Sequence, residues 1–220
     1  MTARGSDPRR SLPPILERPL GFLEFFRAPA PIRDAQALAD FIDQHAAFLM
    51  QKGIYEYSRA RAGHYAKALF RESGFQTAVE QSRWRAYPLG LAMVAELVEG
   101  VLRPYGAERH RQLDALSGIV LSVFDRYPVP AVLGDQAWRE ARAELARRLQ
   151  LIGLHAPKRA FDICEPYTDT YFNLMPIHEK LRASEYPTIR NYLRVTLCNI
   201  HDEFTKRLDA PAVAASLRGD

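Results

Sequence analysis

The sequence predicts an all-α protein, an irregular single-domain bundle of six to eight helices preceded by a proline-rich N-terminal arm. Three observations carry this prediction. Apolar residues recur at helical spacing through most of the chain, proline and glycine separate the periodic segments, and no segment sustains the alternation of β-branched residues that is typical of strands. The segments 88–102 and 188–208 have the densest apolar pattern, and we expect them at the centre of the bundle.

Length and composition indicate one globular domain. The 220 residues can build one hydrophobic core, and contents of 47% hydrophobic and 25% charged residues are ordinary for a globular chain. We expect an arm over residues 1–33, the helical bundle over 34–209 and a frayed tail over 210–220. No uncharged apolar run is long enough for a transmembrane helix, and the first dozen residues lack the apolar segment of a secretory signal. The expected compartment is therefore the cytoplasm.

The arm combines helix-breaking prolines with one apolar cluster, LGFLEFF at residues 20–26, which a solvated tail does not need. This cluster either packs on the body of its own chain or places Phe22, Phe25 and Phe26 on a partner chain or a membrane surface. The arm carries six arginines against three acidic residues, whereas the rest of the chain is close to neutral. A near-neutral body argues against nucleic-acid binding.

The first helical segments are expected between residues 34 and 85. Asp34 is a suitable N-cap for a helix over 34–52, whose apolar residues follow the i, i+3, i+4, i+7 spacing. Gly53 is expected to interrupt the chain, so that a second helix runs over 54–71. A short third helix is expected over 75–85.

The segment 88–102 reads PLGLAMVAELVEGVL and is apolar on nearly every side. Pro88 suits the first turn of this helix. Its one polar sector holds Glu96 and Glu99, one turn apart among small residues. The two carboxylates are the solvated stripe of the helix, or they pair with nearby arginines, or they form a buried functional pair that needs a cation, a proton or a metal. The arginines closest in sequence are Arg83, Arg85 and Arg103.

The second half of the chain is expected to hold further helices separated by prolines. The segment starting at Asp135, as N-cap, has a single narrow apolar stripe and is therefore expected on the outside of the bundle. The last helix has apolar residues on two faces and is expected to be covered on both. The expected ranges are 107–126, 135–151, 158–164, 169–174, 178–183 and 188–208.

Polar and aromatic residues in the first half suggest a binding site. Tyr57, Arg61 and His64 lie near one face of the segment 54–71, and that face is more polar than a core helix requires. Just before the central helix, arginine offers paired hydrogen-bond donors and tryptophan a stacking face, in a cluster of Arg83, Trp84 and Tyr87. The alternative for this cluster is a structural corner, in which Trp84 fills the core and the arginines pair with Glu80, Glu96 or Glu99.

The motifs of common catalytic and metal sites are absent from the sequence. It contains no His-Glu-x-x-His, no Glu-x-x-His, no Gly-x-Ser-x-Gly elbow, no phosphate-binding loop and no dinucleotide-binding glycine pattern. The lone His45 on an apolar stripe is expected to be a core residue with a local hydrogen bond. We therefore expect no metal site, and no cofactor or catalytic residue can be named.

Two functions are consistent with these observations. The first is a non-catalytic interaction or assembly protein, a homodimer that uses the arm and a helix face. The second is a bundle that binds a small anionic or aromatic ligand in an interior polar site, with or without acting on it by acid–base chemistry. Whether the two carboxylates of the central helix face a cavity or an arginine would separate these hypotheses. The interior site would consist of Tyr57, Arg61, His64, Arg83, Trp84, Tyr87, Glu96 and Glu99.

Overall fold

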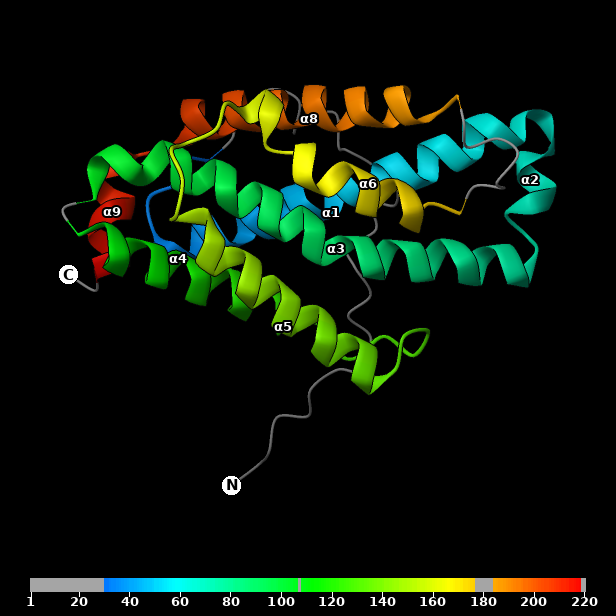
Figure 1. Ribbon diagram of the computed structural model, residues 1–220, viewed down its shortest axis with the longest axis horizontal. Helices are drawn as coiled ribbons and strands as arrows, with labels where there is room; N and C mark the ends of the chain where they lie inside the picture. Colours follow the sequence, from blue (N-terminus) through cyan, green and yellow to red (C-terminus); the bar gives the residue numbers. More distant parts are fainter. Residues whose placement is uncertain (1–29, 107, 177–183, 219–220) are drawn as a thin grey trace.

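The computed structural model describes residues 30–106, 108–176 and 184–218 (Figure 1). Over these residues the fold is an all-α bundle with seven helices of nine residues or more and no β-strand, which confirms the predicted fold class. The helices are α1 (Ala35–Ala62), α2 (Ala66–Leu69), α3 (Ser73–Leu102), α4 (Arg109–Phe124), α5 (Asp135–Ile152), α6 (Glu165–Leu174), α8 (Tyr186–Arg207) and α9 (Ala210–Arg218), with 3-10 turns η2 (Gly63–Tyr65), η3 (Arg103–Tyr105) and η4 (Ala160–Asp162).

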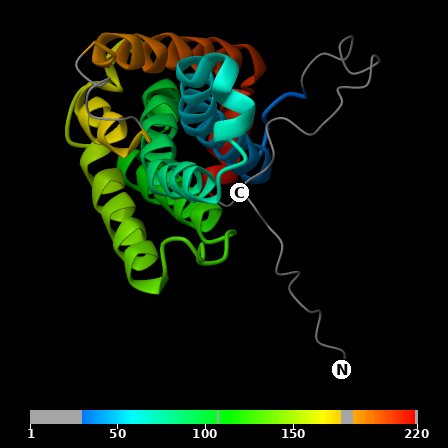
Figure 2. The same cartoon turned by 90° about the vertical axis from the view of Figure 1, so that its right-hand side faces the viewer.

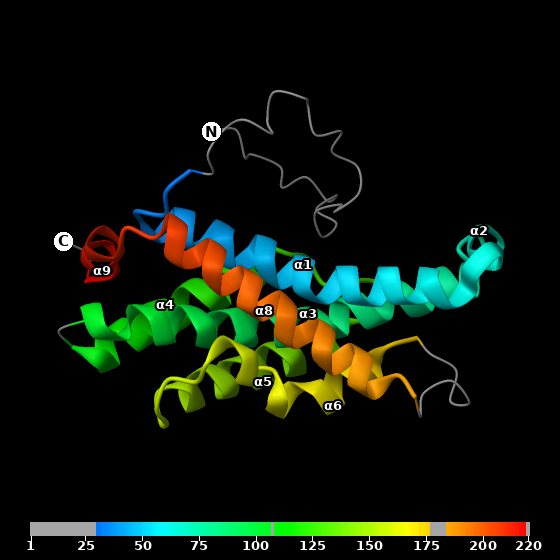
Figure 3. The ribbon, with the colours of Figure 1, turned by 90° about the horizontal axis from the view of Figure 1, so that it is seen from above.

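A long antiparallel pair, α1 and α3, forms the centre of the bundle, and η2 and α2 close this pair at one end (Figures 1 and 3). α3 packs against α1, α4, α5, α6 and α8, and every residue from 86 to 99 is buried. The segment 88–102 therefore lies at the centre, as its apolar pattern predicts. Seen along the bundle, α1 and α3 lie between α8 on one side and α4 with α5 on the other (Figure 2).

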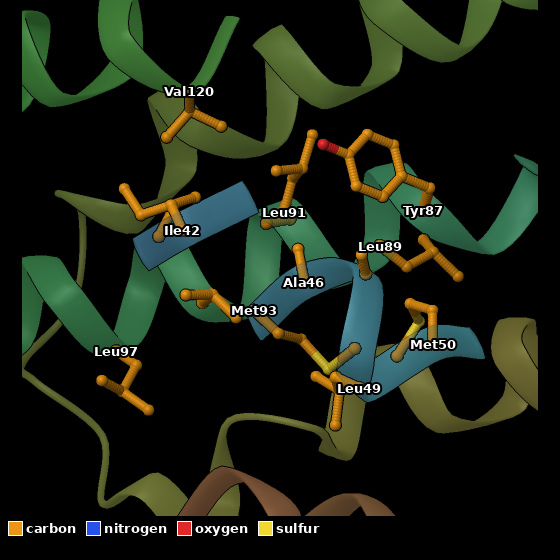
Figure 4. Close-up of a cluster of buried hydrophobic side chains, with 14 of the residues drawn as sticks. Ile42, Ala46, Leu49, Met50, Tyr87, Leu89, Leu91, Met93, Leu97 and Val120 are labelled. Carbon is orange, nitrogen blue, oxygen red and sulfur yellow. The ribbon is translucent and has the colours of Figure 1, made fainter. Parts of the chain in front are cut away.

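The core between α1 and α3 is built from aliphatic side chains that meet across a close helix contact (Figure 4). Ile42, Ala46 and Met50 on α1 are fully buried, as is Leu91 on α3. A fully buried side chain of this size contributes about 1.5–3 kcal/mol. Gly90 on α3 lets the backbones approach, because a Cβ atom there would lie 2.7 Å from the Ala46 carbonyl oxygen.

The predicted break at Gly53 is wrong, because α1 continues through it to Ala62. The reason is tertiary: Gly53 has no side chain, and this allows two tyrosines from other helices to reach the α1 backbone. The hydroxyl of Tyr171 on α6 donates to the Met50 carbonyl oxygen at 3.0 Å, and the hydroxyl of Tyr192 on α8 donates to the Leu49 carbonyl oxygen at 3.0 Å. A Cβ at position 53 would lie 2.7 Å from the Tyr192 ring and would also contact the Tyr171 hydroxyl.

The predicted break before Pro88 is also wrong. Pro88 lies in the interior of α3 rather than in the first turn of a new helix. A proline there removes the hydrogen bond that would reach the carbonyl four residues earlier, that of Trp84. Since Pro88 and its neighbours are buried between five other helices, packing maintains the helix where local propensity would end it.

The C-terminal part of the chain differs from the prediction in two ways. Instead of a frayed tail, residues 210–218 form α9, which packs on α4 and α1 with Val213 and Ala214 buried. The last long helix, α8, lies on the outside of the bundle instead of at its centre (Figure 1), and its outer face leaves Val195 48% exposed. The expected helix over 178–183 lies outside the described residues.

The start of α1 agrees with the prediction, whereas the starts of α5 and α6 and the extent of η4 differ from it. The carboxylate of Asp34 accepts from the Ala37 backbone N–H at 2.8 Å, so the predicted cap of α1 is confirmed. α5 begins at Asp135, but its N-cap is Gly134, with φ 78°. The predicted helix over 158–164 is only the short turn η4, whereas α6 begins at Glu165, four residues before its expected start.

Candidate functional site

The polar sector of α3 lies under a loop of the same chain. Glu96 and Glu99 are each only 5% exposed. The loop between α5 and η4 crosses them, and its Pro157 would be in ordinary van der Waals contact with a Cβ at Gly100, at 3.6 Å. The sector of small residues beside the two carboxylates is therefore covered by the chain's own loop.

Glu96 contacts two side chains of this loop, a lysine and a histidine. Lys158 Nζ lies 2.7 Å from Glu96 Oε1, and His155 Nε2 lies 3.6 Å from the same oxygen. On the other side, the Tyr167 hydroxyl donates to Glu96 Oε2 at 3.5 Å. Burial, followed by the Glu96 charge, raises the pKa of Tyr167 to about 12, so this phenol is a neutral donor near pH 7.

Glu99 is neutralised by Arg103, one of the three arginines considered from the sequence. Arg103 donates from Nε and Nη2 to the two carboxylate oxygens at 2.8 and 2.6 Å. It also donates to the carbonyl oxygen of His155 at 2.9 Å, and Arg109 donates to the carbonyl oxygen of Gly153. The buried carboxylates thus hold the α5–η4 loop on α3, through Arg103 and Lys158.

Trp84 and Tyr87, which were expected before the central helix, lie inside α3 and fill the core. Trp84 packs edge-on against Tyr87, Tyr127 and Trp138, with ring centroids 5.6–6.4 Å apart. The Tyr87 hydroxyl donates to Asp43 Oδ1 at 2.7 Å. Burial raises the pKa of Tyr87, and the Asp43 charge adds to this effect, so Tyr87 is a neutral donor within the core.

Arg83 extends toward α1 and away from the carboxylates of α3. Its Nη2 donates to the Gln51 side-chain oxygen at 2.7 Å. Burial lowers the pKa of Arg83, and Glu80 opposes this effect. The structural-corner alternative is therefore correct for the position of Trp84, whereas the expected arginine pairing with Glu96 or Glu99 does not hold for Arg83.

The remaining expected site residues lie near the far end of α1. Arg61 forms an ion pair with Glu185, a buried residue just before α8, and its Nε donates to the Tyr57 hydroxyl at 3.3 Å. His64 is exposed, and its ring packs on Tyr65 with centroids 4.0 Å apart. Arg61 therefore ties α1 to the start of α8.

These eight residues do not form one site. Sixteen residues separate Arg83 from Glu99 on α3, which corresponds to about 24 Å along the helix axis. His64 lies still farther away, beyond the end of α1 that Figure 3 shows opposite to α9. The partners of Glu96 were not foreseen, because Lys158, His155 and Tyr167 approach it only through tertiary packing.

Two hollows occur elsewhere on the described surface. The first, with a volume of about 190 Å³, lies between the N-terminal part of α4 and α9, and the second, of about 650 Å³, lies at the η2–α2 end of the central pair. The first is lined by Gly106, Glu108, Arg111, Gln112, Ala214, Leu217 and Arg218, and the second by Arg59, Ala60, Gly63, His64, Ala66 and Lys67.

Within the described ranges, histidine, cysteine, aspartate and glutamate side chains do not gather in groups of three that could hold a metal ion. No helix of the described residues has the length and apolar character needed to cross a membrane. The chain matches no protein-family model, and no curated protein or solved structure is significantly similar to it.

Proposed function

We propose that the protein is a non-catalytic assembly protein that forms a homodimer through Phe22, Phe25 and Phe26 of its arm. The observation that carries this proposal is that both α3 carboxylates are neutralised within the chain, Glu96 by Lys158 of the α5–η4 loop and Glu99 by Arg103 of η3. Lys158 and Arg103 occupy the positions that a ligand of an interior acid–base site would need. The interior-ligand hypothesis thereby loses the feature that motivated it.

The chain is firmly anchored where the arm joins the bundle, and this supports the proposal. Ile32 is fully buried and pairs with Leu208 in an isolated parallel bridge. The Ile32 N–H donates to the Arg207 carbonyl at 2.8 Å, and the Asp209 N–H donates to the Ile32 carbonyl at 2.9 Å. Arg207 also donates through Nε to the Ala30 carbonyl at 3.0 Å. The three phenylalanines lie outside the described residues, and the last of them, Phe26, precedes Ala30 by four positions, so the arm joins the bundle at a fixed point close to them.

A hollow with the volume for an aromatic ring, lined by both polar and apolar residues, lies beside this anchor. The α4–α9 hollow includes Ala214 and Leu217, and the adjacent Ser216 accepts a hydrogen bond from the Ala35 N–H at 3.0 Å. Its volume of about 190 Å³ is comparable to that of an engineered cavity of roughly 150 Å³ that binds benzene. We infer that it receives one phenylalanine ring of the arm of the second copy.

The amount of apolar surface in the arm favours a symmetric partner. A buried phenylalanine covers about 150–250 Å², so three such residues from each of two copies would cover about 900–1,500 Å². Specific protein interfaces bury about 1,200–2,000 Å² in total. Two exchanged arms therefore approach the area of a stable dimer, whereas a single arm would not.

The test is the oligomeric state of the full-length chain, measured by native mass spectrometry and by sedimentation across a concentration series. We expect the wild type to be a dimer and the triple variant Phe22→Ser, Phe25→Ser, Phe26→Ser to be a monomer. The control replaces three exposed apolar residues elsewhere on the surface, and it should remain a dimer. A monomeric wild type, or a dimer that survives the arm substitutions, would refute the proposal. The control substitutions are Tyr65→Ser, Val129→Ser and Leu154→Ser.

A further inference from the structure

The second hollow lies at the η2–α2 end of the central pair, away from α9 and the arm anchor (Figures 1 and 3). Its shape depends on Gly63, which ends α1 with φ 53° and donates its N–H to the Arg59 carbonyl. Only glycine adopts this backbone conformation without strain. The turn directs the chain into η2 and α2, so that His64 and Lys67 line the same hollow as Arg59.

The charge of this hollow is incompletely neutralised. Arg59 forms an ion pair with Glu56, at 2.9 Å, but its side chain is still 61% exposed. No acidic side chain among the described residues lies within ion-pair distance of Lys67. Among the described residues, the ion pairs of the lining are limited to that of Arg59 with Glu56, whereas the lining also holds Lys67 and His64.

The helix dipole accounts for only part of this arrangement. Cations are favoured in the last turn of a helix, and Arg59 and Arg61 both lie in the last turn of α1. Arg61, however, is already paired with the buried Glu185. Lys67 belongs to α2, beyond the end of α1, so the carbonyl groups of that end do not explain its position in the hollow.

We propose that this hollow binds a small, multiply charged oxyanion of the phosphate type. One edge of the Arg59 guanidinium donates to Glu56, through Nε at 3.3 Å and Nη2 at 2.9 Å, so its remaining N–H groups would bind a phosphate oxygen, and lysine adds a compact positive charge. Apart from His64, the rest of the lining consists of Ala60, Gly63 and Ala66, which bring no negative charge. The volume of about 650 Å³ lies within the range of small-molecule sites, roughly 300–1,000 Å³.

Isothermal titration of the full chain with inorganic pyrophosphate tests this proposal. We expect saturable binding to the wild type, and we expect Arg59→Gln and Lys67→Gln each to weaken it about tenfold, the usual contribution of a hydrogen bond to a charged group. The matched control is Lys52→Gln. Lys52 lies two turns earlier on α1, packs over the Phe48 ring at 4.8 Å and is not part of the hollow, so its loss should leave binding unchanged.

Three results would overturn the proposal. One is the absence of saturable pyrophosphate binding by the wild type. Another is an equal loss of affinity in Lys52→Gln and Lys67→Gln, which would mean that the anion responds only to the overall charge of the protein. The third is binding of a hexaglutamate peptide without binding of pyrophosphate, which would make the hollow a contact for an acidic protein. The dimer proposal is tested separately, because its readout is mass and not anion affinity.

Discussion

Gly53→Ala should destabilise the protein, although glycine-to-alanine substitutions usually stabilise a helix. In an unconstrained helix interior this change contributes about 1 kcal/mol of stability. At position 53 the added Cβ would lie 2.7 Å from the Tyr192 ring and would meet the Tyr171 hydroxyl. Both tyrosines are held by hydrogen bonds to the α1 backbone, and Tyr171 is fully buried, so neither can move away freely.

The magnitude follows from three contributions. Overpacking costs about 1–3 kcal/mol, and displacement of the Tyr171 hydroxyl from the Met50 carbonyl leaves a buried polar group unsatisfied, at about 1–3 kcal/mol. The helix propensity of alanine offsets about 1 kcal/mol of this cost. We therefore expect the free energy of unfolding to fall by about 3 kcal/mol. With a denaturant slope of about 3 kcal/mol/M, the urea midpoint would fall by about 1 M.

Urea unfolding followed by circular dichroism measures this change. The matched control is Gly118→Ala, at an exposed position in the middle of α4 where a Cβ would have nothing within 4 Å. This control should gain about 1 kcal/mol. In the Gly53→Ala background, Tyr171→Phe should recover part of the loss, because it removes the clashing oxygen. A Gly53→Ala variant as stable as the wild type would show that the tyrosines do not constrain α1.

Further substitutions test other contacts. Lys158→Met should lower the free energy of unfolding by about 3 kcal/mol, because it leaves the buried Glu96 carboxylate without its closest cation. Glu96→Gln should cost less, because the partly exposed Lys158 that it leaves unpaired can be solvated. Equal losses of the two variants in urea unfolding would contradict this. Burial lowers the pKa of His45 against the opposing effect of Glu203, so the unfolded state binds its proton more readily and stability should fall as the pH drops below about 6.5. His45→Gln should flatten that part of the curve of stability against pH, and an unchanged curve would exclude this histidine as its source. Gly134→Ala should lower the thermal midpoint, because φ 78° strains any side chain there even in open space, and an unchanged midpoint would show that the turn relaxes without cost.

The sequence was most informative where the signal is local. The cap at Asp34 needs only the residues that follow it, and the outer position of α5 follows from one narrow apolar stripe, now seen as buried Trp138, Leu145 and Leu149. The pairing of Glu99 with Arg103 was among the alternatives because these residues are four apart on one helix. The eight polar and aromatic residues, in contrast, looked like one site only because sequence order does not show their spread along α1 and α3.

By itself, the sequence determined the all-α class and the central place of 88–102, because helical periodicity is encoded in neighbouring residues; the burial of Glu96 and Glu99 was left open. Only the tertiary structure decided that α1 runs through Gly53 and α3 through Pro88, since the free energy that keeps these helices intact comes from other helices packed against them. It also decided the partner of Glu96. A buried carboxylate requires a compensating charge, but which lysine supplies it depends on the loop that the folded chain brings across α3.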